Sequence, residues 1–208
     1  MSAFGDESTF EDTFFTVSRS SEGLFKDRGS KFFYFSFPVK NEEEIKIHLT
    51  ELRKKYFDAR HHCYAWMLGK DGDQFRANDD GEPNHSAGDP ILGQIRSTNL
   101  TNILIVVVRY FGGTKLGISG LINAYKTSAA LAIEENILVQ DHVKTSVNIR
   151  FPYPMLNDVM KLIKLHELTI SAQEMMLDCK MQLEFRKGLE KSIVSSLEEI
   201  EGLELTIT

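Results

Sequence analysis

The chain has 208 residues, of which 42% are hydrophobic and 26% charged, a composition that excludes a disordered chain and is typical of one large or two small globular domains. Its formal net charge of −6 argues against a protein that coats nucleic acid over its whole surface, although it neither demands nor excludes a polyanionic partner. The longest aliphatic run, Ile103 to Val108, is far shorter than the roughly 20 residues that span a bilayer.

The N-terminal two thirds of the chain predict a domain of mixed strands and helices. We expect strands at 14–18, 32–39, 61–68, 74–77 and 103–108, and helices at 41–56, 91–96 and 119–135. The segment 19–30 contains two glycines and several serines, which indicates a turn, and 78–90 is expected to be a loop. The run 103–108 lacks polar alternation, so it predicts a central strand buried on both faces.

The C-terminal third follows a simpler pattern. We expect strands at 143–151, 168–175, 179–185 and 203–207, with helices at 152–166 and 190–197. This order, β-α-β-β-α-β, is that of the ferredoxin-like fold. The sequence therefore predicts an α+β protein of two domains, residues 13–140 and 141–208.

The two cysteines, Cys63 and Cys179, lie far apart and fit no metal or redox spacing. The acidic N-terminal segment has neither the basic start nor the apolar core of a secretory signal. Together these features favour a cytoplasmic protein with reduced thiols and no membrane partner. We expect no cofactor and no metal, and the oligomeric state stays open.

The first polar cluster is Arg60–His61–His62–Cys63. Strand alternation puts His61 and Cys63 on one face, and Arg60 and His62 on the other. Two ligands are too few for zinc, which needs three or four. A structural or surface histidine pair is the main alternative, and a histidine used for acid–base chemistry or phosphate contact is another.

The second cluster is the acidic turn that contains Asp79, Asp80 and Glu82. Three carboxylates in four residues are able to bind a divalent cation through oxygen ligands. They are also able to pair with arginine or lysine across a cleft, which we favour, or to form a solvated turn. The spacing excludes an EF-hand loop.

The third cluster comprises Arg109, Gly112, Gly113, Thr114 and Lys115. It follows a predicted buried strand and precedes a predicted helix, where backbone N–H groups and the helix dipole attract an anion. It is no Walker A loop, because Ile118 follows Gly117 where that motif requires lysine. A glycine-rich turn without a ligand remains an alternative.

In this order, the motifs resemble those of the YigZ/IMPACT family, in its bacterial branch. The matching stretches are 28–32, 58–65, 79–83, 87–92, 109–121 and 124–125. The resemblance implies that the first domain is similar to the second domain of a small-subunit ribosomal protein. It also implies that the second domain is similar to the last, ferredoxin-like domain of elongation factor G. The chain departs from the family pattern at His85–Ser86, Ser119 and Asn123. Asn123 replaces a residue that is often basic, which removes a positive charge from the helix that would face the anion.

The resemblance also sets the functional hypotheses. Eukaryotic relatives regulate translation by binding a partner of the amino-acid-starvation kinase, whereas bacterial relatives have no settled activity. A binding or regulatory protein that contacts RNA, the ribosome or a translation factor is our first hypothesis. The alternative is an enzyme acting on a small-molecule or phosphoester substrate, with its catalytic residues unknown. A third possibility is structural, with Asp80 or Glu82 bridging Arg60 or Arg109.

The first two hypotheses require the polar residues to meet in one cleft that attracts anions. The residues concerned are Arg60, His61, His62, Arg109, Gly112, Gly113, Thr114 and Lys115, together with the acidic loop of Asp79, Asp80 and Glu82.

Overall fold

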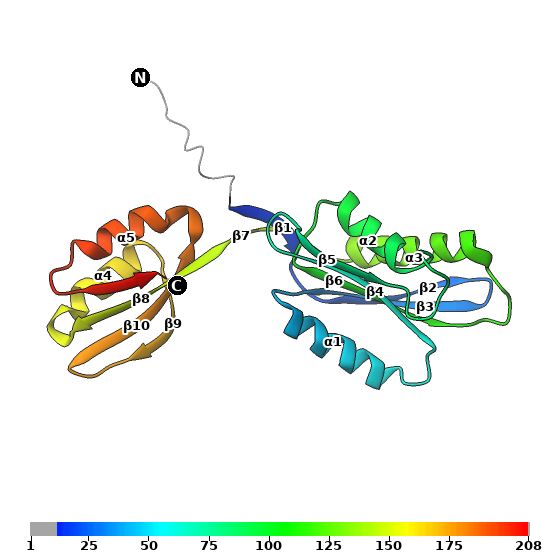
Figure 1. Cartoon of the computed structure of the whole chain (residues 1–208), viewed down its shortest axis with the longest axis horizontal. Helices are drawn as coiled ribbons and strands as arrows, with labels where there is room; N and C mark the ends of the chain where they lie inside the picture. The colour runs from blue at the N-terminus through cyan, green and yellow to red at the C-terminus, as the bar shows by residue number, and fades with distance from the viewer. Residues whose placement is uncertain (1–11, 208) are drawn as a thin grey trace, which may run out of the picture. The chain divides into compact units, whose positions relative to one another are not determined.

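The computed structural model describes residues 12–207 of the chain, and the acidic segment before Asp12 lies outside the described residues. The described chain divides into two compact units, each of mixed helices and strands (Figure 1). The first unit is Phe14–Asp141, and the second comprises residues 142–207 together with Asp12 and Thr13. The sequence-based boundary at Gln140–Asp141 lies one residue from this division.

The first unit is built on a five-stranded sheet in the order β2-β3-β6-β4-β5, with antiparallel pairing throughout. The strands are β2 (Ser21–Asp27), β3 (Ser30–Pro38), β4 (His61–Leu68), β5 (Gln74–Asn78) and β6 (Ile103–Tyr110). A separate pair is formed by β1 (Thr13–Val17) and β7 (Leu138–His142).

Helices cover both faces of this sheet (Figure 1). They are α1 (Glu42–Lys55) on one face, and α2 (Gly88–Ser97) and α3 (Gly117–Glu134) on the other. Ile45 and Leu52 of α1 pack on one side of β6, against Leu104 and Val106. The helices of the other face pack on alternate β6 residues such as Ile105. Every residue from Ile103 to Arg109 is buried, so β6 is the doubly covered central strand that its composition predicts.

Local signals place α1 correctly. The side chain of Asn41 accepts a hydrogen bond from the Glu44 N–H at 2.9 Å, and the Glu44 carboxylate accepts one from the Lys40 N–H at 2.8 Å. Side-chain acceptors at this end satisfy N–H groups that the helix cannot pair internally. Three basic residues, Arg53, Lys54 and Lys55, end the helix, where they oppose the negative end of its dipole.

The prediction of a turn over 19–30 is wrong, because most of this segment is strand β2. Gly23 pairs with Tyr34 across the sheet, and a Cβ at Gly23 would lie 2.3 Å from the Tyr34 hydroxyl oxygen. Glycine is therefore required here by the neighbouring ring, and only Arg28 and Gly29 form a turn. The predicted helix at 91–96 begins earlier, at Gly88.

The second unit has the predicted order β-α-β-β-α-β. Its elements are β8 (Lys144–Pro152), α4 (Leu156–Leu165), β9 (Thr169–Glu174), β10 (Asp178–Arg186), α5 (Glu190–Glu198) and β11 (Glu204–Ile207). The sheet order is β11-β8-β10-β9, with α4 and α5 on one face (Figure 1). Val159 and Ile193 of these helices are fully buried against strand residues such as Ile149 and Leu183. No helix of the described residues is long and apolar enough to cross a membrane.

Candidate functional site

The acidic turn and the central strand meet in a buried ion pair. The guanidinium Nη1 of Arg109 lies 2.6 Å from Oε1 of Glu82, and the two side chains are 8% and 4% exposed. The hydroxyl of Tyr125, on α3, donates a second hydrogen bond to the same carboxylate oxygen at 2.8 Å. Glu82 thus joins the turn to β6 and α3, the kind of bridge that the structural hypothesis expects.

Cys63 extends this network from β4. Its thiol donates to the Tyr125 hydroxyl at 3.3 Å and lies 3.0 Å from the Asp79 carbonyl oxygen. Burial raises the pKa of Cys63 well above its usual value, and burial also raises the pKa of Tyr125. Both groups are therefore neutral near pH 7, so Cys63 lacks the thiolate character of a reactive cysteine.

Asp79 organises the loop that leads into α2. One carboxylate oxygen accepts from the N–H groups of Ala87 and Gly88, both at 2.9 Å, and the other accepts from His85 N–H at 2.8 Å. Burial raises the pKa of Asp79, but these backbone donors outweigh it and leave the pKa below its usual value. The carboxylate caps the start of α2, as expected for an anion at a helix N-terminus.

Asp80 binds the start of β4 and helix α1. Its carboxylate accepts from the His62 N–H at 2.7 Å and pairs with Arg53 at 3.0 Å. The Asp80 carbonyl oxygen lies 2.9 Å from Nδ1 of His61. Arg53 was not among the residues proposed from the sequence. Its position in a basic last turn of a helix gave no sign of this partner, because Asp80 lies 27 residues further along the chain.

His62 lies on the opposite side of β4 from Cys63, as the strand alternation predicts. Its ring is buried, with Nδ1 3.9 Å from the Asp80 carboxylate. Burial lowers the pKa of His62, and the Asp80 carboxylate offsets only part of this effect. The residue therefore favours the neutral imidazole.

The glycine-rich segment packs tightly against the turn between β2 and β3. A Cβ at Gly112 would lie 1.8 Å from the carbonyl carbon of Gly29, and the Gly112 N–H donates to the Ser30 hydroxyl at 3.2 Å. Gly113 has a φ of 89°, a left-handed conformation that favours glycine. Close packing at Gly112 and a left-handed backbone at Gly113 therefore explain these two glycines without a bound anion.

Four basic residues are exposed at the same end of the sheet, which we call the basic end: Arg28, Lys31, Arg60 and Lys115. Lys31 pairs with Tyr110 at the end of β6, and Arg60 precedes His61, which pairs with Arg109. Lys115 lies in the loop that follows β6, and none of the four forms an ion pair with a described residue. Arg60, Thr114 and Lys115 are thus exposed candidates outside the buried network, whereas Arg109 lies within it.

The residues described by the structure contain no cluster of three or more histidine, cysteine or carboxylate groups placed to hold a metal ion. The carboxylates of the acidic turn are instead occupied by backbone N–H groups and arginines. The carboxylates of the acidic turn therefore hold loops and strand ends together, whereas the cations of the basic end are exposed to a ligand.

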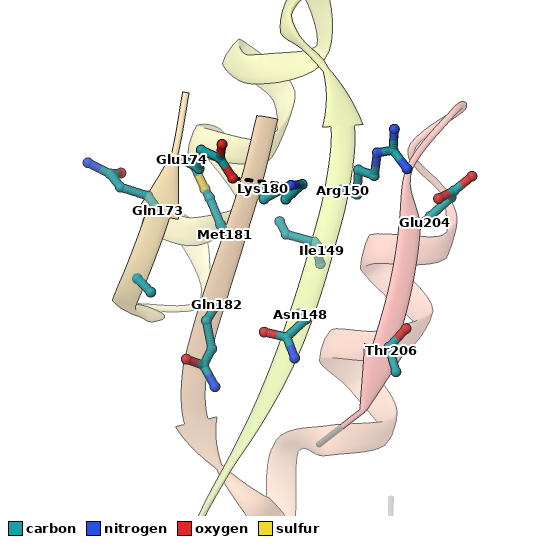
Figure 2. A pocket seen from close by; sticks show the side chains of 11 residues that line it. Asn148, Ile149, Arg150, Gln173, Glu174, Lys180, Met181, Gln182, Glu204 and Thr206 are labelled. Carbon is teal, nitrogen blue, oxygen red and sulfur yellow. Dashed lines mark hydrogen bonds and ion pairs between the residues drawn. The ribbon is translucent and has the colours of Figure 1, made fainter. Parts of the chain in front are cut away.

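The second unit carries a separate hollow of about 500 Å³ on the sheet face opposite α4 and α5 (Figure 2). Two rows of side chains cross it. One is charged, with Lys180 3.1 Å from Glu174 and Arg150 2.7 Å from Asp178. The other row is neutral and includes Asn148, Gln182 and Thr206. None of the described residues that line this hollow is aromatic.

Fold and site together define a protein of two α+β units in which charged motif residues form a buried network below a basic surface. Residues 28–133 match the family described as the Impact N-terminal domain. The IMPACT family member YvyE of Bacillus subtilis is 31% identical over 147 residues, which cover 71% of this chain and 68% of the relative. The chain therefore belongs to the IMPACT family.

Two further proteins are similar to this chain, one in sequence and one in fold. The IMPACT family member YigZ of Escherichia coli is 35% identical over 123 residues, which cover 58% of this chain and 60% of that relative. A crystal structure of a hypothetical protein aligns with 95% of this chain and 98% of its own, with a TM-score of 0.74 and 24% identity. This second likeness shows a common fold over nearly the whole chain.

Proposed function

We propose that this protein is a non-catalytic, cytosolic binding protein of the translation apparatus. Its first unit binds the ribosome, its RNA or a translation factor through the basic end. Membership of a family whose eukaryotic members regulate translation supports this role. As part of this proposal, the first unit is similar to the second domain of a small-subunit ribosomal protein, and the second unit is similar to the last domain of elongation factor G.

The observation that carries the proposal is a group of exposed, unpaired cations at one end of the sheet. The chain has a net charge of −6, yet Arg28, Lys31, Arg60 and Lys115 are exposed together and have no ion-pair partner among the described residues. Unpaired cations at one end of an acidic protein attract a polyanion to that end and orient it.

The buried network supports binding over catalysis. A general acid or base has to come within hydrogen-bond reach of a substrate proton. The Glu82 side chain is 4% exposed, and its carboxylate is bound by Arg109 and Tyr125 of the protein itself. Asp79 is likewise occupied by three backbone N–H groups.

Co-sedimentation with ribosomes at low and high salt tests the proposal. We expect binding at low salt that weakens steeply as salt rises, because phosphate contacts release counterions. The double variant Arg60→Glu/Lys115→Glu should lose most of this binding. The control Lys40→Glu/Lys46→Glu makes the same charge change at exposed positions after β3 and on α1, and should bind like the native protein. Absence of binding at both salt concentrations would overturn the proposal.

A further inference from the structure

An exposed aromatic ring lies within the basic end. Phe111 follows β6 directly and is 57% exposed. The Arg109 guanidinium carbon lies 5.8 Å from the centre of its ring, within cation–π distance. Because Arg109 is itself held by Glu82 at 2.6 Å, the ring is supported by a fixed group beneath it. Phe111 therefore forms a defined apolar platform on the protein surface.

Cations from three separate segments lie at the same end of the sheet as this platform. Gly112, the next residue, packs against Gly29, which brings the neighbouring Arg28 to the same place. Arg60 precedes the His61–Arg109 pair, and Lys115 lies four residues after Phe111.

Carboxylates also lie at this end of the sheet. Asp27 and Asp58 lie in the same segments, and the Asp58 carboxylate accepts a hydrogen bond from the Tyr110 hydroxyl. The acidic turn is neutralised within the protein, since Glu82 pairs with Arg109 and Asp80 with Arg53, so Arg28, Arg60 and Lys115 are unpaired cations among the described residues at this end.

We propose that the basic end binds single-stranded RNA, with an unpaired base stacked on Phe111 and the adjacent phosphates held by Arg28, Arg60 and Lys115. This inference rests on the proposed function and names the chemistry of its ligand. An aromatic platform within a cationic groove is the arrangement by which proteins bind single strands, since every base offers a π face. A duplex keeps its bases stacked on one another, and an acidic peptide offers charge without that stacking partner.

The second unit is the weaker candidate for such a ligand. The described residues lining its sheet face include no aromatic side chain, and its two cations, Arg150 and Lys180, are each paired with a carboxylate. A further carboxylate, Glu204, lines the same face. The face thus lacks both a stacking platform and a surplus of positive charge.

Fluorescence anisotropy with the full chain tests this inference. The probes are a mixed-sequence single-stranded RNA of about 10 nucleotides, a duplex of the same sequence, and polyglutamate. We expect the single strand to bind best, and Phe111→Leu to weaken it by about 5- to 150-fold. The salt dependence should stay unchanged in this variant, because no charge is removed.

Two further variants make the test specific. Phe75→Leu is the matched control, because Phe75 is 49% exposed and also lies beside a guanidinium, that of Arg96 at 4.3 Å, but belongs to β5. It should leave RNA binding unchanged. Phe111→Trp should preserve binding, and its added indole fluorescence should be quenched by the RNA.

The possible failures are distinguishable. If Phe111→Leu binds the single strand like the native protein, or if the duplex binds equally well, stacking is refuted while salt-sensitive ribosome binding leaves the proposed function intact. Preference for polyglutamate would identify a protein partner and overturn the inference. Loss of ribosome binding with retained RNA stacking would refute the proposed function alone.

Discussion

At the scale of single residues, the sequence signals that suggested a ligand site are explained largely by internal contacts. Arg109 lies near the end of the buried strand β6 and pairs with Glu82, and Gly112 is required by its contact with Gly29. Each of these residue types is also typical of an anion site, so the sequence alone leaves both readings open. The deciding information is the distance between segments, which only the folded chain supplies.

The Glu82–Arg109 pair makes the first prediction. Glu82→Ala leaves the Arg109 charge buried without its partner, which should lower the free energy of unfolding by about 3–5 kcal/mol. Urea denaturation followed by the fluorescence of Trp66, the chain's single tryptophan and a residue of β4, measures the first unit. The control Glu22→Ala removes an exposed partner of Lys55 and should cost at most about 1 kcal/mol. Equal losses in the two variants would contradict a structural role for Glu82.

His62 makes a prediction about pH. Burial lowers its pKa below the ordinary 6.5, so the unfolded chain binds a proton before the folded chain does. The stability contributed by neutral His62 is therefore present above pH 6.5 and is lost as the pH falls towards the lower, folded pKa. We expect the free energy of unfolding to decline as the pH falls below 6.5, and His62→Gln to remove part of this decline. Urea titrations across that range measure it, and an identical decline in the variant would contradict the assignment.

At the scale of elements, the sequence predicts those whose signals are local. The capping residues Asn41 and Glu44 locate α1, and the apolar run 103–108 locates β6. Strand β2 was missed because a glycine such as Gly23 is typical of a turn. In the structure, Gly23 is a strand residue whose missing side chain leaves room for the Tyr34 ring on the neighbouring strand. The pairing of Asp80 with Arg53 was missed for a related reason, since it depends on how α1 lies against β4.

Two glycines in the first unit lead to opposite predictions. At Gly112 an added Cβ would lie 1.8 Å from Gly29, so Gly112→Ala has to displace backbone and should cost at least about 1–3 kcal/mol. Gly93 lies within α2 with nothing within 4 Å of the added Cβ, so Gly93→Ala should stabilise the unit by about 0.5–1 kcal/mol. Urea denaturation monitored at Trp66 compares the two. Unchanged or increased stability in Gly112→Ala would show that the Gly112 contact is not close-packed, and a loss in Gly93→Ala would contradict the prediction for α2.

At the scale of the whole molecule, charge and connectivity are distributed unevenly between the units. Arg28, Lys31, Arg60 and Lys115 lie without ion-pair partners among the described residues at the basic end of the first unit, whereas Arg150 and Lys180 of the second unit are each paired with a carboxylate. The net charge of −6 predicts neither of these features, because it does not say where on the folded protein the charges lie. The boundary predicted from the sequence has the same limit. It assigns one continuous segment to each domain, whereas Asp12 belongs to the second unit.

Asp12 is held in the second unit by several contacts. Its carboxylate pairs with Arg186 at 2.6 Å and accepts from the Gly188 N–H at 2.8 Å, while its carbonyl oxygen accepts from the Val143 N–H at 2.7 Å. The hydrogen bond from Arg186 lowers the pKa of Asp12 from 3.8 to about 2. The carboxylate therefore stabilises the second unit above pH 3.8, and this contribution is lost as the pH falls to about 2.

The last prediction follows from these contacts. Asp12→Asn should destabilise the second unit at neutral pH by about 1.5–3 kcal/mol, because it weakens hydrogen bonds to a charged group. It should also remove the part of acid unfolding that depends on this carboxyl. Hydrogen exchange of the β10 amides measures the second unit separately from Trp66 in the first. The control Asp178→Asn affects an exposed pair with Arg150 and should leave exchange nearly unchanged. Faster exchange throughout the first unit, with β10 unaffected, would show that Asp12 stabilises the other unit instead.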